Sequence, residues 1–208
     1  MRIALVRHGP TAWNAEKRVQ GTIDTSLSDE GRSKMAGLLP PAGFDSARPF
    51  CSPRLRARQT AVLLGLENPT IDERLAEQNW GSWEGLTRAE MLARDGEDAF
   101  ERAGARHGLA FRPPGGESTG ELHARLRSFL EDIAGQETDI VAVTHMGVLR
   151  AAYVLATNWD MSAPMPSELD LTAALVLSLD RDGTPAIAEL NAPLQVRGGL
   201  TPRTGSGA

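Results

Sequence analysis

Five residues of the sequence have side chains that could carry out one reaction together. Two imidazoles, two guanidinium groups and one carboxylate suit phosphoryl transfer. An imidazole can attack phosphorus, arginines can bind phosphate oxygens, and a carboxylic acid can protonate the departing oxygen. Because this chemistry is complete without a metal ion, we expect neither a metal nor another cofactor. The five residues are Arg7, His8, Arg56, Glu77 and His145.

Each of these residues follows a segment that we expect to form a strand. We expect strands at 2–6, up to 50–51, at 70–72, 139–144, 171–179 and 186–190, the last two as an antiparallel hairpin. Helical patterns lie between them at 29–39, 54–66, 88–106, 120–133 and 148–156. This alternation predicts an α/β fold, a three-layer sandwich whose mostly parallel central sheet carries helices on both faces. Ligands bind at the carboxyl ends of such strands, so the five side chains should share one edge of the sheet.

Other residues compete for some of these roles. Glu84 and Glu117 are alternatives to Glu77 as the acid, and Arg58 is the alternative to Arg56. His107 and His123 lack the spacing of metal ligands, so we interpret both as surface or helix residues. Trp80 and Trp83 are expected to anchor the core or a loop rather than to stack on a ligand.

The composition excludes several classes of protein. The 208 residues carry a formal net charge of −5, which argues against nucleic-acid binding, and no apolar run approaches the roughly 20 residues of a membrane span. Only Ile3–Val6 precede the first charged pair, too few for the apolar core of a signal peptide, and Cys51 is the single cysteine. We therefore expect a cytoplasmic protein in which Cys51 is a buried filler.

Six motifs along the chain give it a family resemblance. The sequence resembles the histidine phosphatase superfamily, which has the phosphoglycerate mutase-like fold. The motifs are RHGPT at 7–11 with Asn14, QG at 20–21, SPRLRA at 52–57, LAEQNWGSWEG at 75–85, GGES at 115–118 and THMG at 144–147.

The resemblance implies a role for each matching residue. His8 would be the nucleophile that becomes phosphorylated, with its ring oriented by a hydrogen bond to the Gly9 carbonyl. Arg7, Arg56 and His145 would hold the phosphoryl oxygens. Two nearby arginines should also disfavour the protonated form of His8, which must be neutral to attack.

The remaining matches would complete the pocket. Glu77 would protonate the leaving group and then activate water. Asn14 and Gln20 would contribute to the pocket, Asn14 through a side-chain donor, and Gly21 would do so by close backbone approach. The helix that begins near Gly147 would direct backbone N–H groups at the same phosphate.

The resemblance favours the phosphatase branch of the superfamily. We expect one domain over 1–196, with a variable lid at about 86–118 that shapes specificity, and a flexible tail at 197–208. The substrate would be a small phosphorylated metabolite, and the resemblance leaves open whether the protein forms a homodimer. A phosphoglycerate mutase is the alternative, although Gln78 replaces the arginine that follows the acid in mutases. A second alternative is a phospho-ligand-binding protein without turnover.

Overall fold

The structure is a computed structural model that describes residues 1–103, 108–157, 159 and 168–198. A six-stranded sheet in the order β4-β3-β5-β1-β6-β7 forms its centre. The first four of these strands run parallel, and β6 and β7 are antiparallel additions at one edge. The strands are β1 (Arg2–Arg7), β3 (Arg48–Cys51), β4 (Thr70–Ile71), β5 (Ile140–Thr144), β6 (Ala174–Leu179) and β7 (Pro185–Ala192).

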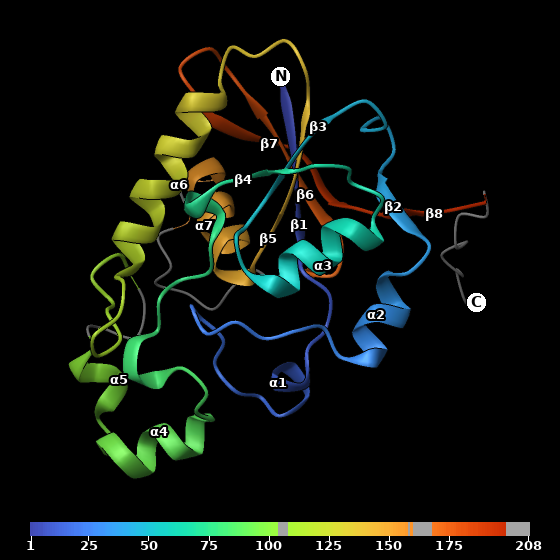
Figure 1. The fold of residues 1–208 in the computed structure, drawn as a ribbon. Coiled ribbons are helices and arrows are strands. Elements are labelled where there is room, and N and C mark those ends of the chain that lie inside the picture. The colour runs from blue at the N-terminus through green and yellow to red at the C-terminus, as the bar shows by residue number, and fades with distance from the viewer. Residues whose placement is uncertain (104–107, 158, 160–167, 199–208) are drawn as a thin grey trace, which may run out of the picture.

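Helices cover both faces of this sheet (Figure 1). A second, two-stranded sheet pairs β2 (Leu38–Pro41) with β8 (Leu194–Val196). The helices are α1 (Ala12–Ala15), α2 (Asp29–Met35), α3 (Leu55–Leu63), α4 (Arg88–Asp95), α5 (Ala99–Arg102), α6 (Thr119–Ile133) and α7 (Met146–Thr157), with short 3-10 turns η1 (Glu73–Leu75) and η2 (Gly81–Trp83).

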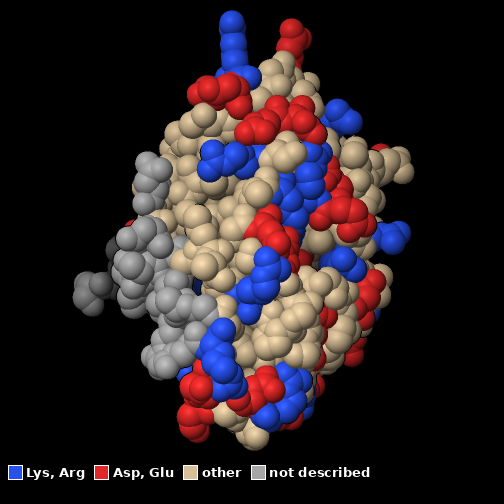
Figure 2. Space-filling model, turned by 90° about the vertical axis from the view of Figure 1, so that its left-hand side faces the viewer, with Lys and Arg blue, Asp and Glu red and all other residues tan. Residues whose placement is uncertain are grey.

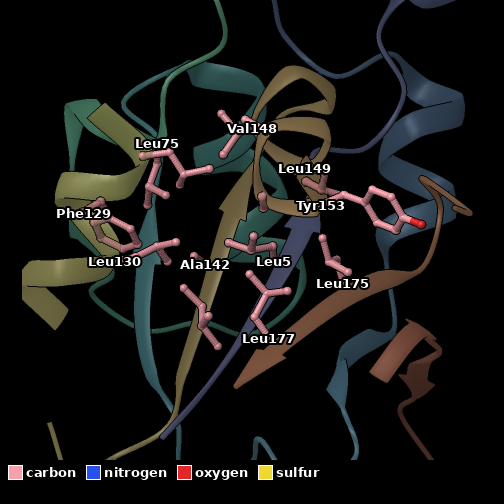
Figure 3. Packing of buried hydrophobic residues seen from close by; sticks show 14 of the residues in the cluster. Leu5, Leu75, Phe129, Leu130, Ala142, Val148, Leu149, Tyr153, Leu175 and Leu177 are labelled. Carbon is pink, nitrogen blue, oxygen red and sulfur yellow. The ribbon is translucent and has the colours of Figure 1, made fainter. Parts of the chain in front are cut away.

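The alternation of side chains along the strands divides the core into two halves. On one face, Leu5, Ala142 and Leu177 pack with residues of α6 and α7, including Phe129 and Leu149 (Figure 3). The neighbouring residues along the same strands point to the opposite face, where they pack against α3 and α2. Because β5 lies between β3 and β1 with helices on both faces, every one of its residues is buried.

A third, smaller cluster lies under the segment expected to form a lid. Trp83, Met91 and Ala99 are its buried members, and Phe100 and Phe111 pack on them. The cluster is formed by η2, α4, α5 and the loop before α6, which lie at one end of the molecule, away from most of the sheet (Figure 1).

Several expected boundaries are wrong, and each error has a physical cause. The helix expected over 29–39 ends at Met35, and the chain then enters β2, which pairs with β8 at 194–196. The helix expected over 88–106 is broken at Gly96 into α4 and α5, and 104–107 lie outside the described residues. The strand expected from 171 begins at Ala174, because Thr172 instead donates its backbone N–H to the Asp170 carboxylate.

The outer surface mixes charges of both signs. Lys and Arg side chains stand beside Asp and Glu on the side of the molecule that carries α6 (Figure 2). Among the described residues, no helix combines the length and the apolar character that crossing a bilayer requires.

Candidate active site

His8 lies directly after β1, at the carboxyl edge of the sheet. Its backbone N–H donates to the Thr144 carbonyl at 2.9 Å, which fixes the residue against the end of β5. Its ring Nδ1 donates to the Gly9 carbonyl at 2.7 Å, so the proton-free ring nitrogen is Nε2. Burial, reinforced by the positive charge of Arg56, lowers the pKa of His8 to about 3. His8 is therefore a neutral, oriented imidazole, as expected, although burial contributes more than the arginines do.

His145 is brought beside His8 by the parallel pairing of their strands. Arg7 at the end of β1 is in register with Thr144 at the end of β5, and the two imidazole centroids lie 5.2 Å apart. The Nε2 atom of His145 lies 2.7 Å from the Ser52 hydroxyl oxygen, whereas its buried Nδ1 has no hydrogen-bond partner among the described residues. Burial and the neighbouring His8 lower the pKa of His145 well below its ordinary value.

Glu77 reaches the same place from the segment after η1. One carboxylate oxygen accepts the backbone N–H of Gln78 at 2.9 Å, and both accept the N–H of Gly147, at 3.1 and 3.2 Å. Burial raises the pKa of Glu77 in spite of these hydrogen bonds. A raised pKa keeps a carboxyl protonated closer to neutral pH, which suits a general acid.

The contact between Glu77 and Gly147 corrects one expectation. The first turn of α7 does not direct the Gly147 N–H at a phosphate, because the Glu77 carboxylate accepts it. A Cβ atom on Gly147 would lie 2.2 Å from a Glu77 oxygen. Gly147 therefore helps to hold the Glu77 carboxylate in position.

Arg56 occupies the first turn of α3 and is fully buried. Its two terminal nitrogens donate to the carbonyls of Gly21 and Ile23, at 2.9 and 3.1 Å, and its buried Nε has no partner in the part of the chain that the structure describes. Its charge acts on both His8 and Glu77. The alternative, Arg58, is exposed.

Gly21 plays a different part from the one expected. A Cβ atom there would lie 2.0 Å from the Glu84 carboxylate and 2.9 Å from the Gln78 carbonyl, so the close approach is to the protein's own loop. The carbonyl of Gly21 holds Arg56. Gly21 thus contributes to the site by positioning the Arg56 guanidinium.

A cavity of about 630 Å³ opens at this edge of the sheet. Five of the eight expected site residues line it: Arg7, His8, Asn14, Gln20 and Glu77. Gly21, Arg56 and His145 are not part of the lining, and the side chains of Arg56 and His145, expected to hold phosphoryl oxygens, are fully buried. The cavity continues under the expected lid, which contributes Arg88, Phe100, Gly108 and Phe111 to the lining.

Asn14 and Gln20 present amide groups to the cavity. The side-chain oxygen of Asn14 accepts the N–H of Thr11 at 2.9 Å, and that of Gln20 accepts the hydroxyls of Thr11 and Thr25 at 2.9 Å. Because their oxygens are engaged, these amides can offer NH₂ donors to an anion.

The competing carboxylates are engaged elsewhere. Glu84 accepts backbone N–H groups of Thr22, Ile23 and Trp80, which ties two loops together. Glu117 forms a two-point ion pair with Arg125. Glu77 is the one carboxylate among the described residues that line the cavity.

Two basic residues that line the cavity are not among the expected site residues. His123, interpreted as a surface or helix residue, is on α6 but buried, and it lines the cavity. Its position three residues before Leu126 and seven before Leu130 places it on the apolar face of the helix. This spacing in the sequence is the signal that indicates a buried histidine. Arg150, one turn into α7, also lines the cavity. Its positive charge contributes to lowering the pKa of Arg7, and the charge of Glu77 raises the pKa of Arg150 itself against the larger effect of burial. His107 lies outside the described residues.

The aromatic and thiol predictions have clear outcomes. Trp83 is fully buried and donates its indole N–H to Asp95, which agrees with the expected core or loop anchor, whereas Trp80 is half-buried and lines the cavity. Cys51 is buried, and burial raises its pKa to about 12, which fits an inert filler. Within the described ranges, no three His, Cys, Asp or Glu side chains gather closely enough to hold a metal ion.

A neutral histidine, a protonatable carboxyl and clustered arginines at the carboxyl edge of an α/β sheet define an enzyme of phosphoryl transfer. The model of the histidine phosphatase superfamily (branch 1) matches residues 3–193. The chain belongs to this superfamily, and it is an enzyme of the phosphatase type.

Relatives and solved structures agree with this membership. A glucosyl-3-phosphoglycerate phosphatase of Mycobacterium tuberculosis is 32% identical over 164 residues, 72% of each chain. A metal-independent phosphoserine phosphatase of Arabidopsis thaliana is 33% identical over 75% of this chain and 68% of its own. The structure of a mycobacterial glucosyl-3-phosphoglycerate phosphatase complexed with VO₃ aligns with a TM-score of 0.72 at 28% identity, covering 92% of this chain and 98% of that one.

Proposed function

We propose that this protein hydrolyses a small phosphate monoester through a phosphohistidine on His8, without a metal ion. The observation that carries the proposal is the state of His8, which is neutral, oriented through Nδ1 by the Gly9 carbonyl, and in the same cavity as Glu77. Relatives whose names specify phosphatases support hydrolysis as the overall reaction.

The first half-reaction transfers the phosphoryl group to the enzyme. Nε2 of His8 attacks phosphorus, the bond from phosphorus to the ester oxygen breaks, and the proton on Glu77 passes to that oxygen, so the alcohol leaves neutral. The guanidinium of Arg7, with the buried side chains of Arg56 and His145, stabilises the charge on the phosphoryl oxygens.

The second half-reaction returns the enzyme to its starting state. Glu77, now a carboxylate, takes a proton from water, whose oxygen attacks phosphorus. The P–N bond breaks, which releases inorganic phosphate and neutral His8. Glu77 ends this step protonated, so protons balance over the cycle.

Gln78 favours hydrolysis over a mutase reaction. A mutase must hold its substrate's carboxylate while the phosphoryl group returns to a second hydroxyl. Gln78 is mostly buried, and its side-chain amide donates to the Glu117 carbonyl at 2.9 Å, so this position supplies no cation.

The test is hydrolysis of p-nitrophenyl phosphate in the presence of EDTA, combined with trapping of ³²P-labelled enzyme. We expect metal-free turnover and an acid-labile label on the wild type. His8→Ala should have neither and should stay folded, because His8 lies at a strand end outside the core. Arg56→Ala should lose turnover, and Arg58→Ala, its exposed neighbour, is the matched control that keeps it.

Other outcomes would replace the proposal. Full activity in His8→Ala would exclude the phosphohistidine. Binding of phosphate by the wild type without label or turnover would favour the phospho-ligand-binding alternative. Isomerisation of 3-phosphoglycerate without hydrolysis of any ester would favour the mutase.

A further inference from the structure

His123 is a buried polar side chain that the phosphoryl chemistry does not use. It is 7% exposed, on α6, and it lines the cavity that contains His8 and Glu77. No hydrogen bond to its ring is found in the part of the chain that the structure describes. Its ring nitrogens are not among the fully buried side-chain atoms that lack a partner in the described chain, so they are open to the cavity. An imidazole open to a cavity can be satisfied by whatever enters that cavity.

Thr119 stands one helical turn before His123 and lines the same wall. It is 5% exposed, and its backbone N–H donates to the Phe111 carbonyl at 3.0 Å. Its hydroxyl, like the imidazole of His123, has no partner among the described residues. Residues four apart on a helix are surface neighbours, so two unpaired polar groups lie side by side.

The surroundings indicate what these two groups can bind. Burial, and secondarily the positive charge of Arg127, lowers the pKa of His123, so its ring is neutral at pH 7. A neutral imidazole has one donor and one acceptor nitrogen, and a threonine hydroxyl both donates and accepts. The complementary ligand group also donates and accepts, which describes an alcohol hydroxyl better than a carboxylate, which only accepts.

The wall beside this pair is aromatic. Phe111 and Trp80 both line the cavity, with ring centroids 5.8 Å apart. Arg18, on the same lining, is already paired with Glu16 and Glu90. Apolar walls with a few placed polar groups fix the orientation of a ligand, and aromatic faces accept the C–H face of a sugar or polyol.

We propose that Thr119 and His123 form a specificity subsite that binds hydroxyl groups of the leaving alcohol, so the substrate class is a phosphorylated sugar or polyol. The proposal rests on the proposed function, since it names the substrate of the same site. The two residues contact the leaving group and take no part in the transfer of the phosphoryl group.

The test compares two primary alkyl esters with the same six-carbon chain, sorbitol 6-phosphate and hexyl phosphate. Each is assayed with wild type, Thr119→Val, His123→Phe and His123→Gln. Because the leaving groups differ in hydroxyls and hardly in the chemistry at phosphorus, the ratio of their kcat/KM values reports the subsite. Glu131→Gln, at an exposed position on the same helix, is the matched control.

We expect wild type to prefer sorbitol 6-phosphate. Thr119→Val and His123→Phe should each lower kcat/KM for that ester by about tenfold or more, mainly through KM, because a buried hydroxyl loses its partner. Hexyl phosphate should change less than threefold. His123→Gln, which keeps a donor and an acceptor, should restore part of the loss, and Glu131→Gln should behave as wild type.

Three results would overturn the subsite. They are equal losses on both esters, a wild type without preference, or a loss confined to an ester with a terminal carboxylate such as 6-phosphonooxyhexanoate, which would assign the pair to an anion. Hydrolysis of p-nitrophenyl phosphate by every variant separates these results from failure of the proposed function, in which no ester is hydrolysed at all.

Discussion

The buried, neutral state of His8 makes a prediction about acid stability. The pKa of His8 is about 3 in the folded protein against 6.5 for an exposed histidine. Between these pH values the unfolded chain binds a proton that the folded chain does not, so stability is complete above pH 6.5 and is lost as pH falls. At pH 5.0 this single group costs about 2 kcal/mol, and below pH 3 it approaches about 5 kcal/mol.

The perturbation is His8→Asn, whose amide nitrogen can take the place of Nδ1 and donate to the Gly9 carbonyl. Urea unfolding at pH 7.5 and 5.0 gives the stability lost over that interval. The variant should lose at least about 2 kcal/mol less than wild type. Any relief of His145, whose pKa His8 also lowers, acts in the same direction. Arg58→Gln removes a charge that does not titrate here and should lose as much as wild type.

An equal loss in wild type and His8→Asn would refute this reasoning. It would mean that His8 binds its proton as readily in the folded protein as in the unfolded chain. His8, the proposed nucleophile, would then be protonated at mildly acidic pH, and activity would fall with it. An unchanged m-value in all three proteins is required for the comparison, since it shows that the same surface unfolds.

Three further predictions concern the groups around His8. Glu77→Gln should lower kcat about 10²- to 10⁴-fold for an alkyl phosphate and far less for p-nitrophenyl phosphate. It should also remove the fall in kcat/KM that wild type shows as pH rises through the raised pKa of Glu77. Equal loss on both esters would exclude Glu77 as the acid. Arg56→Ala should lower the free energy of unfolding by roughly 2–6 kcal/mol in urea titrations because two carbonyls lose their donor, while Arg58→Ala should change it by less than about 0.5 kcal/mol; equal effects would contradict the buried role. Gly147→Ala should displace the Glu77 carboxylate and lower kcat about tenfold or more with little change in Tm; full activity would show that the carboxylate has room to move.

The strands that carry the site could be predicted because their signals are local. Ile3–Val6 and 139–144 are short apolar runs followed directly by Arg7 and by His145, and parallel strands must end at a common edge. The pairing of β2 with β8 could not be predicted in the same way. Its partners lie at opposite ends of the chain, and neither segment has a clear strand pattern of its own.

The residues of the site were easier to identify than their contacts. The types and order of Arg7, His8, Glu77 and His145 follow from the motifs. That Gly147 donates to Glu77, or that Gly21 holds Arg56, depends on loops from distant parts of the sequence meeting in space. Local pattern carries no information about such meetings.

Because the small cluster around Trp83 packs separately from the main core, the shape of the cavity can change without a change in the position of His8 and His145. The three buried residues of this cluster are distinct from the two clusters that hold the central sheet. Replacements among Phe100, Phe111 and Arg88 can reshape the far end of the cavity while β1 and β5 keep His8 and His145 in register. A replacement in this segment can therefore change which molecules fit the cavity without moving the two histidines.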